Sequence, residues 1–510
     1  YSMKVIKHLV PGLLLLIFFQ QIHAQINHLN PVTLDKYYTQ EIKNYKVPGL
    51  AVAIVHADSI LLQSGYGNIS KDSHRPVDKN TLFGIASLTK TFTAGLTAIA
   101  VSENKLSFDT SIKEILPDFK LYDPYVTSQV TIRDALSHRT GLGNFSGDLI
   151  WYGSSVSDSV IIRRLQHLEP DHGFRSGFGY SNIMYLVISK VLEETYQKPY
   201  INILDSLIVD PLQMKNTTCC FKEAMAHQNL AHPHIESNKE TILQPYLSWD
   251  NMLPAGGLFS NAQDLSIYIQ MLLNNGIHGD SRIIRNKYLE KLWGQQTPKK
   301  LSWLDKHFDT PVNFKSYGMG WALMDFNGHK VVHHSGGLDG MVSQLVLIPD
   351  KKIGAVFLAN KTTALPTALM YDLLDRLLIK DTSHNYPEQT IALLNKIKKS
   401  DVNQSSVYSA PEAIDTSFYC GQYFDSLVGP AKIYKKNDSI ILNVEQSNIF
   451  RGYLIQSEML SFDLYWPNVP SLNKGKVNFE VNGLGEIKGF TINLPNPDLH
   501  FKELYFSKQH

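Results

Sequence analysis

A serine hydroxyl becomes a nucleophile when a base lies beside it, and a lysine one helical turn later is placed to act as that base. The pattern Ser-x-x-Lys occurs three times in the sequence, beginning at Ser87, Ser102 and Ser471. Ser87 alone stands where an extended run ends at Gly84 and a helix of small and apolar residues begins. A helix start offers positive potential and free backbone N–H groups to an oxyanion. The motif therefore favours Ser87 as a nucleophile beside Lys90, although by itself it fits an ordinary helix start with a solvated lysine equally well.

A Tyr-x-Asn motif formed by Tyr180 and Asn182 shifts that balance. It follows a loop rich in glycine and aromatic residues. A phenol that a loop places beside a lysine ammonium is expected to have a lowered pKa, which would suit it to accept a proton. The pattern recurs at Tyr66 and Tyr200, but those copies fall in an expected strand and an expected helix. We therefore select Tyr180 as a second candidate catalytic residue.

A third motif leads into an expected strand hairpin and consists of His334, Ser335, Gly336 and Gly337. Glycine lets the backbone approach a ligand closely, so that an N–H group can point at it. Standing alone, a histidine of this kind would be interpreted as a structural residue. Its place after the other two motifs makes the segment a candidate substrate-binding strand.

The elements that must position these residues follow from hydrophobic periodicity. Strands are expected at 50–55, 60–65, 342–348 and 353–358, and helices at 34–46, 91–101 and 367–378. Strands at both ends of this region predict an α/β sheet that is assembled around a helical insertion. From Phe418 onward, short alternating runs separated by turn residues predict an all-β barrel or sandwich.

The chain is expected to have four segments, and the first is a secretory signal. Basic Lys4 and Lys7 precede an apolar run that ends at Phe19, and small Ala24 marks a cleavage site. As a helix the run would reach only about 17 Å, against roughly 30 Å for a membrane core. We expect a signal peptide at 1–24, a catalytic domain at 25–380, a linker at 381–413 that includes a helix at 389–399, and an all-β domain at 414–510. The protein is therefore expected to be exported, to a periplasm or outside the cell, without a stable membrane span after signal removal.

Charge and cysteine content exclude several other classes. The 48 Lys and Arg residues against 47 Asp and Glu give a net charge of +1, which lacks the basic excess typical of nucleic-acid binders. Three cysteines are too few for a disulfide framework and lack the spacing of a zinc site. No glycine-rich phosphate loop occurs. We expect no metal, no cofactor and no nucleic-acid partner, and a small molecule or peptide as substrate.

The order of the three motifs resembles that of the serine β-lactamase and penicillin-binding protein superfamily, in its class C-like branch. The supporting stretches 131–142, 254–260 and 317–321 also match, and the resemblance covers about 32–380. It implies an α/β fold with an antiparallel sheet flanked by helices, plus a helical lobe. The C-terminal part resembles the small barrel, lipocalin-like in some relatives, that follows many such hydrolases. That barrel is expected to shade the active site, to mediate oligomerisation or to contact envelope glycans, and its sequence does not separate these roles.

The resemblance also implies roles for the site residues. Ser87 would be the acylated nucleophile and Lys90 would help to activate it. Tyr180 would be the general base and would later protonate the leaving group. Asn182 would contact the substrate amide or hold Lys90, and the backbone N–H groups of Ser87 and Gly337 would form the oxyanion hole. Whether Lys90 or Tyr180 takes the proton stays open.

One departure from the family pattern bears on the substrate. Where β-lactamases have Lys-Thr-Gly, this chain has His334, Ser335 and Gly336, so a permanent cation is replaced by a group largely neutral at pH 7. This departure weakens an antibiotic interpretation. We expect an exported serine hydrolase that cleaves a small amide, peptide (including one with D-residues) or ester through a Ser87 acyl-enzyme. The alternatives are a β-lactamase or D-alanyl-D-alanine carboxypeptidase, and a catalytically inactive peptidoglycan-binding or ligand-binding protein on the same scaffold.

Overall fold

The computed structural model describes residues 30–237, 239–308, 310–379, 384–401, 416–437, 439–469 and 471–509. The expected signal peptide, 1–24, lies outside the described residues, as does 402–413 of the expected linker. Within the described ranges, no helix has both the length and the apolar character needed to cross a membrane.

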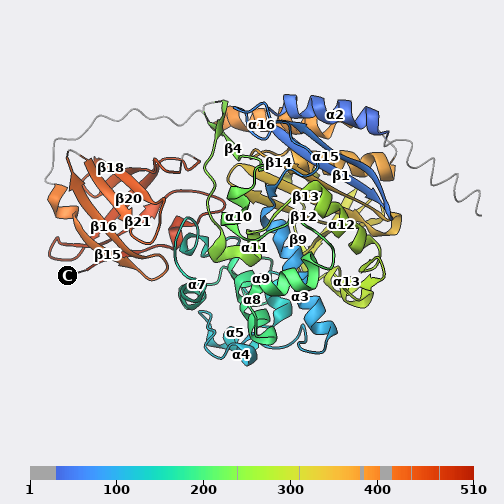
Figure 1. The fold of residues 1–510 in the computed structure, drawn as a ribbon. Coiled ribbons are helices and arrows are strands. Elements are labelled where there is room, and N and C mark those ends of the chain that lie inside the picture. Colours follow the sequence, from blue (N-terminus) through green and yellow to red (C-terminus); the bar gives the residue numbers. More distant parts are fainter. Residues whose placement is uncertain are drawn as a thin grey trace, which may run out of the picture.

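An eight-stranded antiparallel sheet forms the centre of the larger part of the molecule (Figure 1). Its strands run in the order β2-β1-β14-β13-β12-β11-β10-β9. Their bounds are β1 (Gly49–His56), β2 (Ser59–Gly67), β9 (Thr297–Lys299), β10 (Val312–Tyr317), β11 (Ala322–Phe326), β12 (His329–Leu338), β13 (Met341–Ile348) and β14 (Ile353–Ala359). Early β1 pairs with late β14, with Leu50 opposite Ala359. The expectation of a sheet assembled from both ends of the domain is confirmed.

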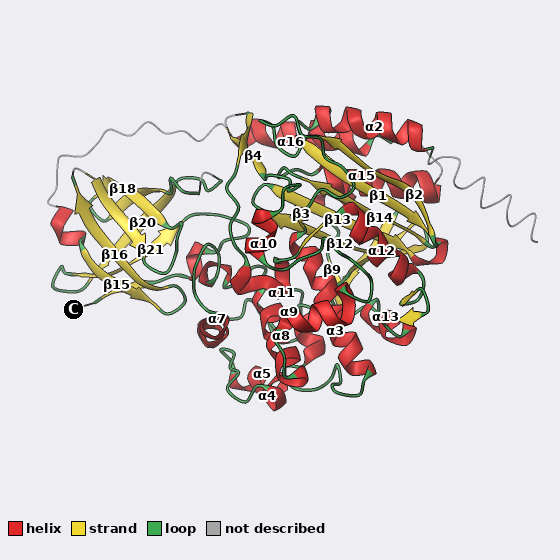
Figure 2. Ribbon diagram, viewed as in Figure 1, coloured by secondary structure: helices red, strands yellow, loops and turns green. Residues whose placement is uncertain are grey.

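Helices cover both faces of this sheet because its central strands are apolar on both sides. In β1, Leu50 and Val52 point into one buried cluster, and Ala51 and Ala53 point into another. Alternate residues of a strand face opposite sides, so the continuous apolar run of β1 serves two cores. One face carries α2 (Pro31–Asn44), α15 (Leu365–Leu374) and α16 (Tyr386–Asp401), and the other carries α12 (Ala262–Leu273) and a helical lobe (Figure 2).

The helical lobe is built around α3 (Thr89–Ser102), in which every residue from Thr89 to Val101 is buried. The remaining helices of the lobe and its surroundings are α4 (Ile112–Ile115), α5 (Pro124–Gln129), α6 (Ile132–Leu136), α7 (Asp158–Arg164), α8 (Ile183–Tyr196), α9 (Tyr200–Leu204), α10 (Phe221–Ala226), α11 (Leu253–Gly256), α13 (Asn286–Leu292) and α14 (Trp303–His307). Three short strand pairs complete the domain: β3 (Phe83–Gly84) with β6 (Phe259–Ser260), β4 (His234–Ser237) with β5 (Glu240–Leu243), and β7 (Ile277–His278) with β8 (Ser281–Arg282). A helix buried all round has no polar face to expose, which explains the small and apolar residues that the sequence shows there.

The helix expected within the linker is present as α16, and it packs against α15. The hydroxyl of Tyr45, which follows α2, donates a hydrogen bond of 2.7 Å to the backbone carbonyl of Pro387. This part of the expected linker is therefore attached to the sheet domain.

The C-terminal part is a closed antiparallel barrel in which each strand pairs with the next and β22 pairs with β15. Its strands are β15 (Gly421–Asp425), β16 (Gly429–Lys436), β17 (Ser439–Val444), β18 (Arg451–Glu458), β19 (Ser461–Tyr465), β20 (Gly475–Val481), β21 (Ile487–Asn493) and β22 (Phe506–Lys508). Phe462, Phe479 and Phe490 fill its interior and are almost fully buried. Of the two expected architectures, barrel and sandwich, the structure is the barrel.

The barrel docks on the helical lobe through apolar and polar contacts. The side chain of Ile449 packs against Gly153, whose carbonyl accepts a hydrogen bond of 2.8 Å from the Asn448 N–H. On the other side of the contact, the Gly147 N–H donates to the Glu503 carboxylate at 2.9 Å. Apolar side chains of the lobe and barrel form one continuous buried cluster. The barrel is therefore held against the loops at 147–154, beside the predicted site.

A buried carboxylate fixes the loop that carries Tyr180. Asp134, at the start of α6, is fully buried and contacts the guanidinium groups of Arg139 at 2.6 Å and Arg175 at 2.7 Å. Burial raises its pKa, but the hydrogen bonds from Arg175 and Thr131 outweigh burial, so the pKa is lowered overall. The Arg175 N–H also donates to the Arg139 carbonyl at 3.0 Å. The loop is thus joined to the lobe a few residues before the tyrosine.

Replacement of Asp134 by alanine is expected to lower the free energy of unfolding by about 3 kcal/mol, because two arginines lose a buried counter-charge. The matched control is Asp109→Ala, which breaks a more exposed pair with Arg133 and is expected to cost less than about 1 kcal/mol. Denaturant unfolding of the three proteins measures the difference. Equal destabilisation by the two substitutions would contradict this assignment.

Candidate active site

Ser87 lies in a tight turn between β3 and α3. It occupies the 3₁₀ turn Ala86–Leu88, and Ala86 has a left-handed backbone with φ of +50°. A non-glycine residue in this region carries strain of order 1–3 kcal/mol, which surrounding contacts must offset. The Thr89 hydroxyl supplies one such contact with a hydrogen bond of 2.6 Å to the Ala86 carbonyl. The turn exposes Ser87 to a cavity at the start of the helix.

The glycine segment of strand β12 packs closely against this turn. A Cβ atom on Gly336 would lie 2.3 Å from the Ile85 carbonyl oxygen and 2.9 Å from the Ser87 nitrogen, so no side chain fits there. A Cβ on Gly337 would meet nothing within 4 Å, and both Gly337 and Ser335 border the cavity. The structure therefore places Gly336 and Gly337 beside Ser87, and the oxyanion hole formed by the N–H groups of Ser87 and Gly337 stays a prediction.

Lys90 is completely buried, and its amine has three partners. Nζ lies 3.0 Å from Ser87 Oγ, 2.7 Å from the Asn182 side-chain oxygen and 2.8 Å from the Ala255 carbonyl oxygen. The amide and carbonyl oxygens only accept hydrogen bonds. A neutral amine therefore donates both of its protons to them and turns its lone pair toward the serine hydroxyl. Burial lowers the pKa of Lys90 to about 7, against an opposing effect of Asp148, so the neutral form is well populated at neutral pH.

Asp148, which the sequence analysis did not identify, completes this network. Its carboxylate accepts hydrogen bonds from the Asn182 side-chain nitrogen at 2.6 Å and from Trp151 Nε1 at 2.9 Å. These bonds orient the Asn182 amide so that its oxygen accepts a hydrogen bond from Lys90, and contact of Asn182 with a substrate amide stays a prediction. Burial raises the pKa of Asp148 to about 7, although the hydrogen bonds and Lys90 lower it. A lone aspartate in a loop has no spacing signal that would reveal this role.

Tyr180 lies where expected, but its acidity differs from the expectation. It shares a hydrogen bond with Ser87, and its ring centroid is 4.8 Å from Lys90 Nζ. The lowered pKa that the sequence analysis predicted is wrong, because burial raises the pKa of Tyr180 well above its ordinary value. The cost of desolvating a phenolate exceeds the lowering effect of the Ser87 hydrogen bond. Tyr180 is therefore a protonated phenol at neutral pH.

The ring of His138 packs against this phenol. The sequence analysis included His138 only as part of the supporting stretch 131–142. Its ring lies 4.4 Å from the Tyr180 ring, between centroids, and its Nδ1 accepts a hydrogen bond of 3.0 Å from the Ser181 N–H. Burial lowers its pKa well below the ordinary value. A neutral, buried His138 thus fixes the backbone next to Tyr180.

His334 is neutral, as expected. Its Nδ1 lies 2.7 Å from the Ser335 carbonyl oxygen, which only accepts, so Nδ1 carries the proton. Its Nε2 then accepts the Tyr317 hydroxyl at 2.8 Å. Burial lowers the pKa of His334 to about 3. Both ring nitrogens are occupied by protein partners, so the ring builds the wall of the site.

The candidate site opens into a cavity of about 1470 Å³. Besides the expected residues, its walls include Trp151, Tyr152, Phe178 and Trp249 from the larger domain. Loops of the barrel contribute Ser471, Leu472, Asn496, Asp498 and Leu499. Of the three roles open for the barrel, shading of the active site is the one that this contact supports.

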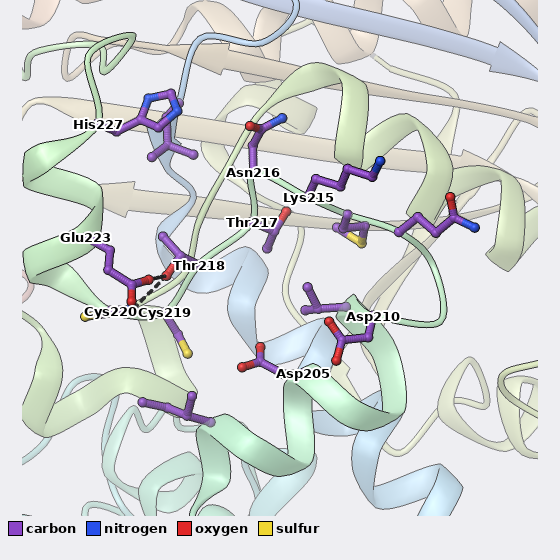
Figure 3. Close-up of a pocket in the computed structure, with 15 residues that line it drawn as sticks. Asp205, Asp210, Lys215, Asn216, Thr217, Thr218, Cys219, Cys220, Glu223 and His227 are labelled. Atoms are coloured by element: carbon purple, nitrogen blue, oxygen red, sulfur yellow. Dashed lines mark hydrogen bonds between the residues drawn. The ribbon is translucent and has the colours of Figure 1, made fainter.

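A second cavity, of about 590 Å³, contains none of the predicted site residues. It lies next to α9 and α10, and Asp205, Glu223, Cys219 and Cys220 are among its lining residues (Figure 3). Among the residues that the structure describes, no group of three His, Cys, Asp or Glu side chains is placed to hold a metal ion.

Comparison with known proteins agrees with the motifs and the fold. Residues 34–378 match the family model described as Beta-lactamase. The chain is 29% identical over 359 residues to the unguisins hydrolase ungD of Aspergillus violaceofuscus, a match that covers 66% of this chain and 63% of that protein. This chain therefore spans less than two thirds of the length of that curated relative.

Solved structures show the same fold. The octameric penicillin-binding protein homologue from Pyrococcus abyssi aligns with a TM-score of 0.62 and 20% identity, over 93% of this chain and 99% of that one. A D-stereospecific amidohydrolase from Streptomyces aligns with a TM-score of 0.53 and 17% identity, over 68% of this chain and 97% of that one. The Pyrococcus alignment extends over the barrel as well as the sheet domain. The family model covers most of this chain, and the structure brings Ser87, Lys90 and Tyr180 together as the motifs predict. This chain belongs to the β-lactamase family.

Proposed function

We propose that the protein is an exported serine hydrolase that cleaves a small amide or peptide, including one with D-residues, or an ester through an acyl-enzyme on Ser87. The observation that carries this proposal is the amine of Lys90, 3.0 Å from the serine oxygen, with both of its other contacts made to acceptors. This geometry leaves the lone pair of the neutral amine for the serine proton. Export rests on the sequence of 1–24 alone.

In the acylation step, Ser87 Oγ forms a bond to the substrate carbonyl carbon while its proton moves to Lys90 Nζ. The carbonyl π electrons move to oxygen, and the N–H groups of Ser87 and Gly337 are proposed to stabilise the resulting charge. The Lys90 ammonium then has three acceptors, because the serine oxygen no longer donates.

In the collapse of this intermediate, the leaving group departs with the bonding pair and needs a proton. The Tyr180 phenol supplies that proton, and the adjacent Lys90 ammonium, 4.8 Å from the Tyr180 ring centroid, then reprotonates the phenolate, so that both groups return to their neutral forms. Water then attacks the acyl carbon while Lys90 takes one of its protons. Tyr180 protonates Ser87 Oγ as that oxygen leaves, and Lys90 reprotonates Tyr180. We therefore propose Lys90 as the base and Tyr180 as the acid, which is one of the two assignments that the resemblance left open.

Replacement of Ser87 by alanine is expected to reduce turnover by at least about three orders of magnitude, because the acyl-enzyme no longer forms. We would assay a short-chain aryl ester, a D-alanyl anilide and a chromogenic cephalosporin with both proteins. The preferred compound distinguishes an esterase, a D-peptidase and a β-lactamase. Turnover that persists in Ser87→Ala would contradict the proposal. Silence of the folded wild type on all three compounds would favour a ligand-binding protein.

The kcat/KM for a neutral ester is expected to rise with pH through about 7, because the active form of Lys90 is neutral and becomes populated above its pKa. Lys90 and Asp148 are coupled, so the apparent pKa of this rising limb of the pH–rate profile belongs to the pair and to neither residue alone. Asp148→Asn preserves the shape and removes the negative charge that raises the pKa of Lys90, so the limb is expected to move to lower pH. A limb that stays in place in this variant would contradict the role of the carboxylate.

Tyr180→Phe is expected to reduce hydrolysis of an anilide by roughly 10²- to 10⁴-fold, the contribution typical of a general acid. An aryl ester with a good leaving group needs no such proton, so its loss should be much smaller. Tyr317→Phe, which also removes a buried hydroxyl beside the site, serves as the control and should affect both substrates to a similar degree. An equal loss on both substrates in Tyr180→Phe would argue for a packing role instead.

A further inference from the structure

An unpaired lysine borders the active-site cavity at the end of β9. Lys299 lies on this edge strand, opposite Lys315 of β10, and is one of the residues that line the cavity. Its Nζ sits 4.6 Å from the ring centroid of Phe178 and 5.7 Å from that of Tyr317. The aromatic faces hold the ammonium by cation–π attraction, and part of the side chain is exposed to the cavity.

Within the part of the chain that the structure describes, the Lys299 ammonium makes no hydrogen bond or ion pair. The nearby carboxylate, Asp305, already forms an ion pair with Lys315 and accepts hydrogen bonds from the Ser302 N–H and from Tyr371. Burial and the charge of Lys315 lower the pKa of Lys299 to about 8, against an opposing effect of Asp305. At neutral pH this lysine is thus a mostly protonated cation that has lost much of its water and has no counter-ion.

Apart from Asp305, whose charge acts on Lys299 but is paired with Lys315, the described groups around Lys299 carry no negative charge. His334, on β12, is neutral, and the neighbouring His333 has a buried Nδ1 without a hydrogen-bond partner. Lys300 also borders the cavity but is exposed to solvent. A desolvated cation gains more from an anion than a solvated one does, because the cost of removing its water has already been met.

Of the acidic residues that line the cavity, Asp148 belongs to the Lys90 network and Glu236 on β4 pairs with Lys361, which leaves Asp339 and Asp498. Asp339 follows β12 and lies five positions after His334, a span of at most about 17 Å of extended chain. It accepts a hydrogen bond from Tyr152, and Asp498 of the barrel adds a second carboxyl group that acts on Tyr152. Ser87, against Gly336, lies between the two ends. The cavity is therefore cationic on the His334 side and acidic on the other.

We propose that Lys299 binds a carboxylate of the substrate at the end of the cavity beside His333 and His334. This inference rests on the proposed function and narrows it to amides or esters that bear a negative charge. The carboxylate would take the place of the missing counter-ion, and the acidic end would disfavour binding in the reverse direction. Lys299 would act in specificity, while the bond-breaking steps stay with Ser87, Lys90 and Tyr180.

The test compares three aryl esters: a neutral parent, one with a carboxylate on the acyl group, and one with it on the leaving group. The measured quantity is the ratio of kcat/KM for each charged ester to that for the parent. We expect Lys299→Met to lower one of the two ratios by roughly 10- to 100-fold, the range for a charge-assisted hydrogen bond. Lys299→Arg should retain most of the preference, and the ester that responds shows on which side of the scissile bond the carboxylate lies.

Lys300→Met is the matched control, because it removes the adjacent charge from the same edge of the cavity. An unchanged ratio in Lys299→Met, or an equal fall in Lys300→Met, would overturn the proposal in favour of a structural cation or a diffuse positive potential. Removal of a partly buried cation that makes no ion pair should leave the fold intact, and Lys299→Gln provides a second variant if the methionine protein is unstable.

A binding measurement separates this proposal from the proposed function, because it needs no turnover. Benzoate and benzamide, which have similar shapes, are titrated calorimetrically into the Ser87→Ala protein. Tighter binding of benzoate, lost in the Ser87→Ala/Lys299→Met protein, supports the carboxylate site even if no ester is cleaved. Equal affinities, or no binding of benzoate at millimolar concentration, would refute it even in a confirmed hydrolase.

Discussion

The removal of one amine from water governs the architecture around the site. Lys90 is buried without a carboxylate in contact, and its nearest negative group, Asp148, acts through the amide of Asn182. Direct contact with a carboxylate would keep the amine charged and useless as a base. Complete isolation would make the charged form, which the reaction needs, too costly. The intervening amide gives an intermediate attraction, and the pKa of the amine accordingly stays near 7.

This arrangement needs groups from parts of the chain that are distant in sequence. The 3₁₀ turn before α3 provides the serine, and the first turn of α3 provides the lysine. The residue before α8 provides the amide, and α11 provides the carbonyl of Ala255. Strand β12 then closes on the nucleophile turn, where Gly336 leaves no room for a side chain. The helical lobe is packed against the sheet through apolar contacts, and these hold the polar network at distances of 2.6–3.0 Å.

The sequence allowed prediction of those features that have a local pattern. The strands at both ends of the domain, the helix after Ser87, the barrel strands and the neutral histidine at 334 all follow from periodicity, turn residues or residue type. Asp148 could not be found in this way, since its role depends on a contact across the lobe. The sequence analysis predicted a lowered pKa for Tyr180, whereas burial raises it. A sequence shows that a charged residue is a neighbour, but it does not show how deeply the phenol is buried. Lys299 belongs to no sequence motif. Its lack of an ion-pair partner among the described residues becomes evident only in the three-dimensional structure.

The pairing of β1 with β14, with Leu50 opposite Ala359, determines when the protein can first act. A chain emerges from the ribosome with its N-terminus first, so the nucleophile turn exists long before the strand that carries Gly336 and the strand that completes the sheet. Long-range strand pairing is also slow, because distant segments must meet before any contact stabilises them. The serine therefore lacks the β12 side of its site during most of synthesis, and the topology itself delays the appearance of a competent catalyst until almost the whole sheet domain has been made.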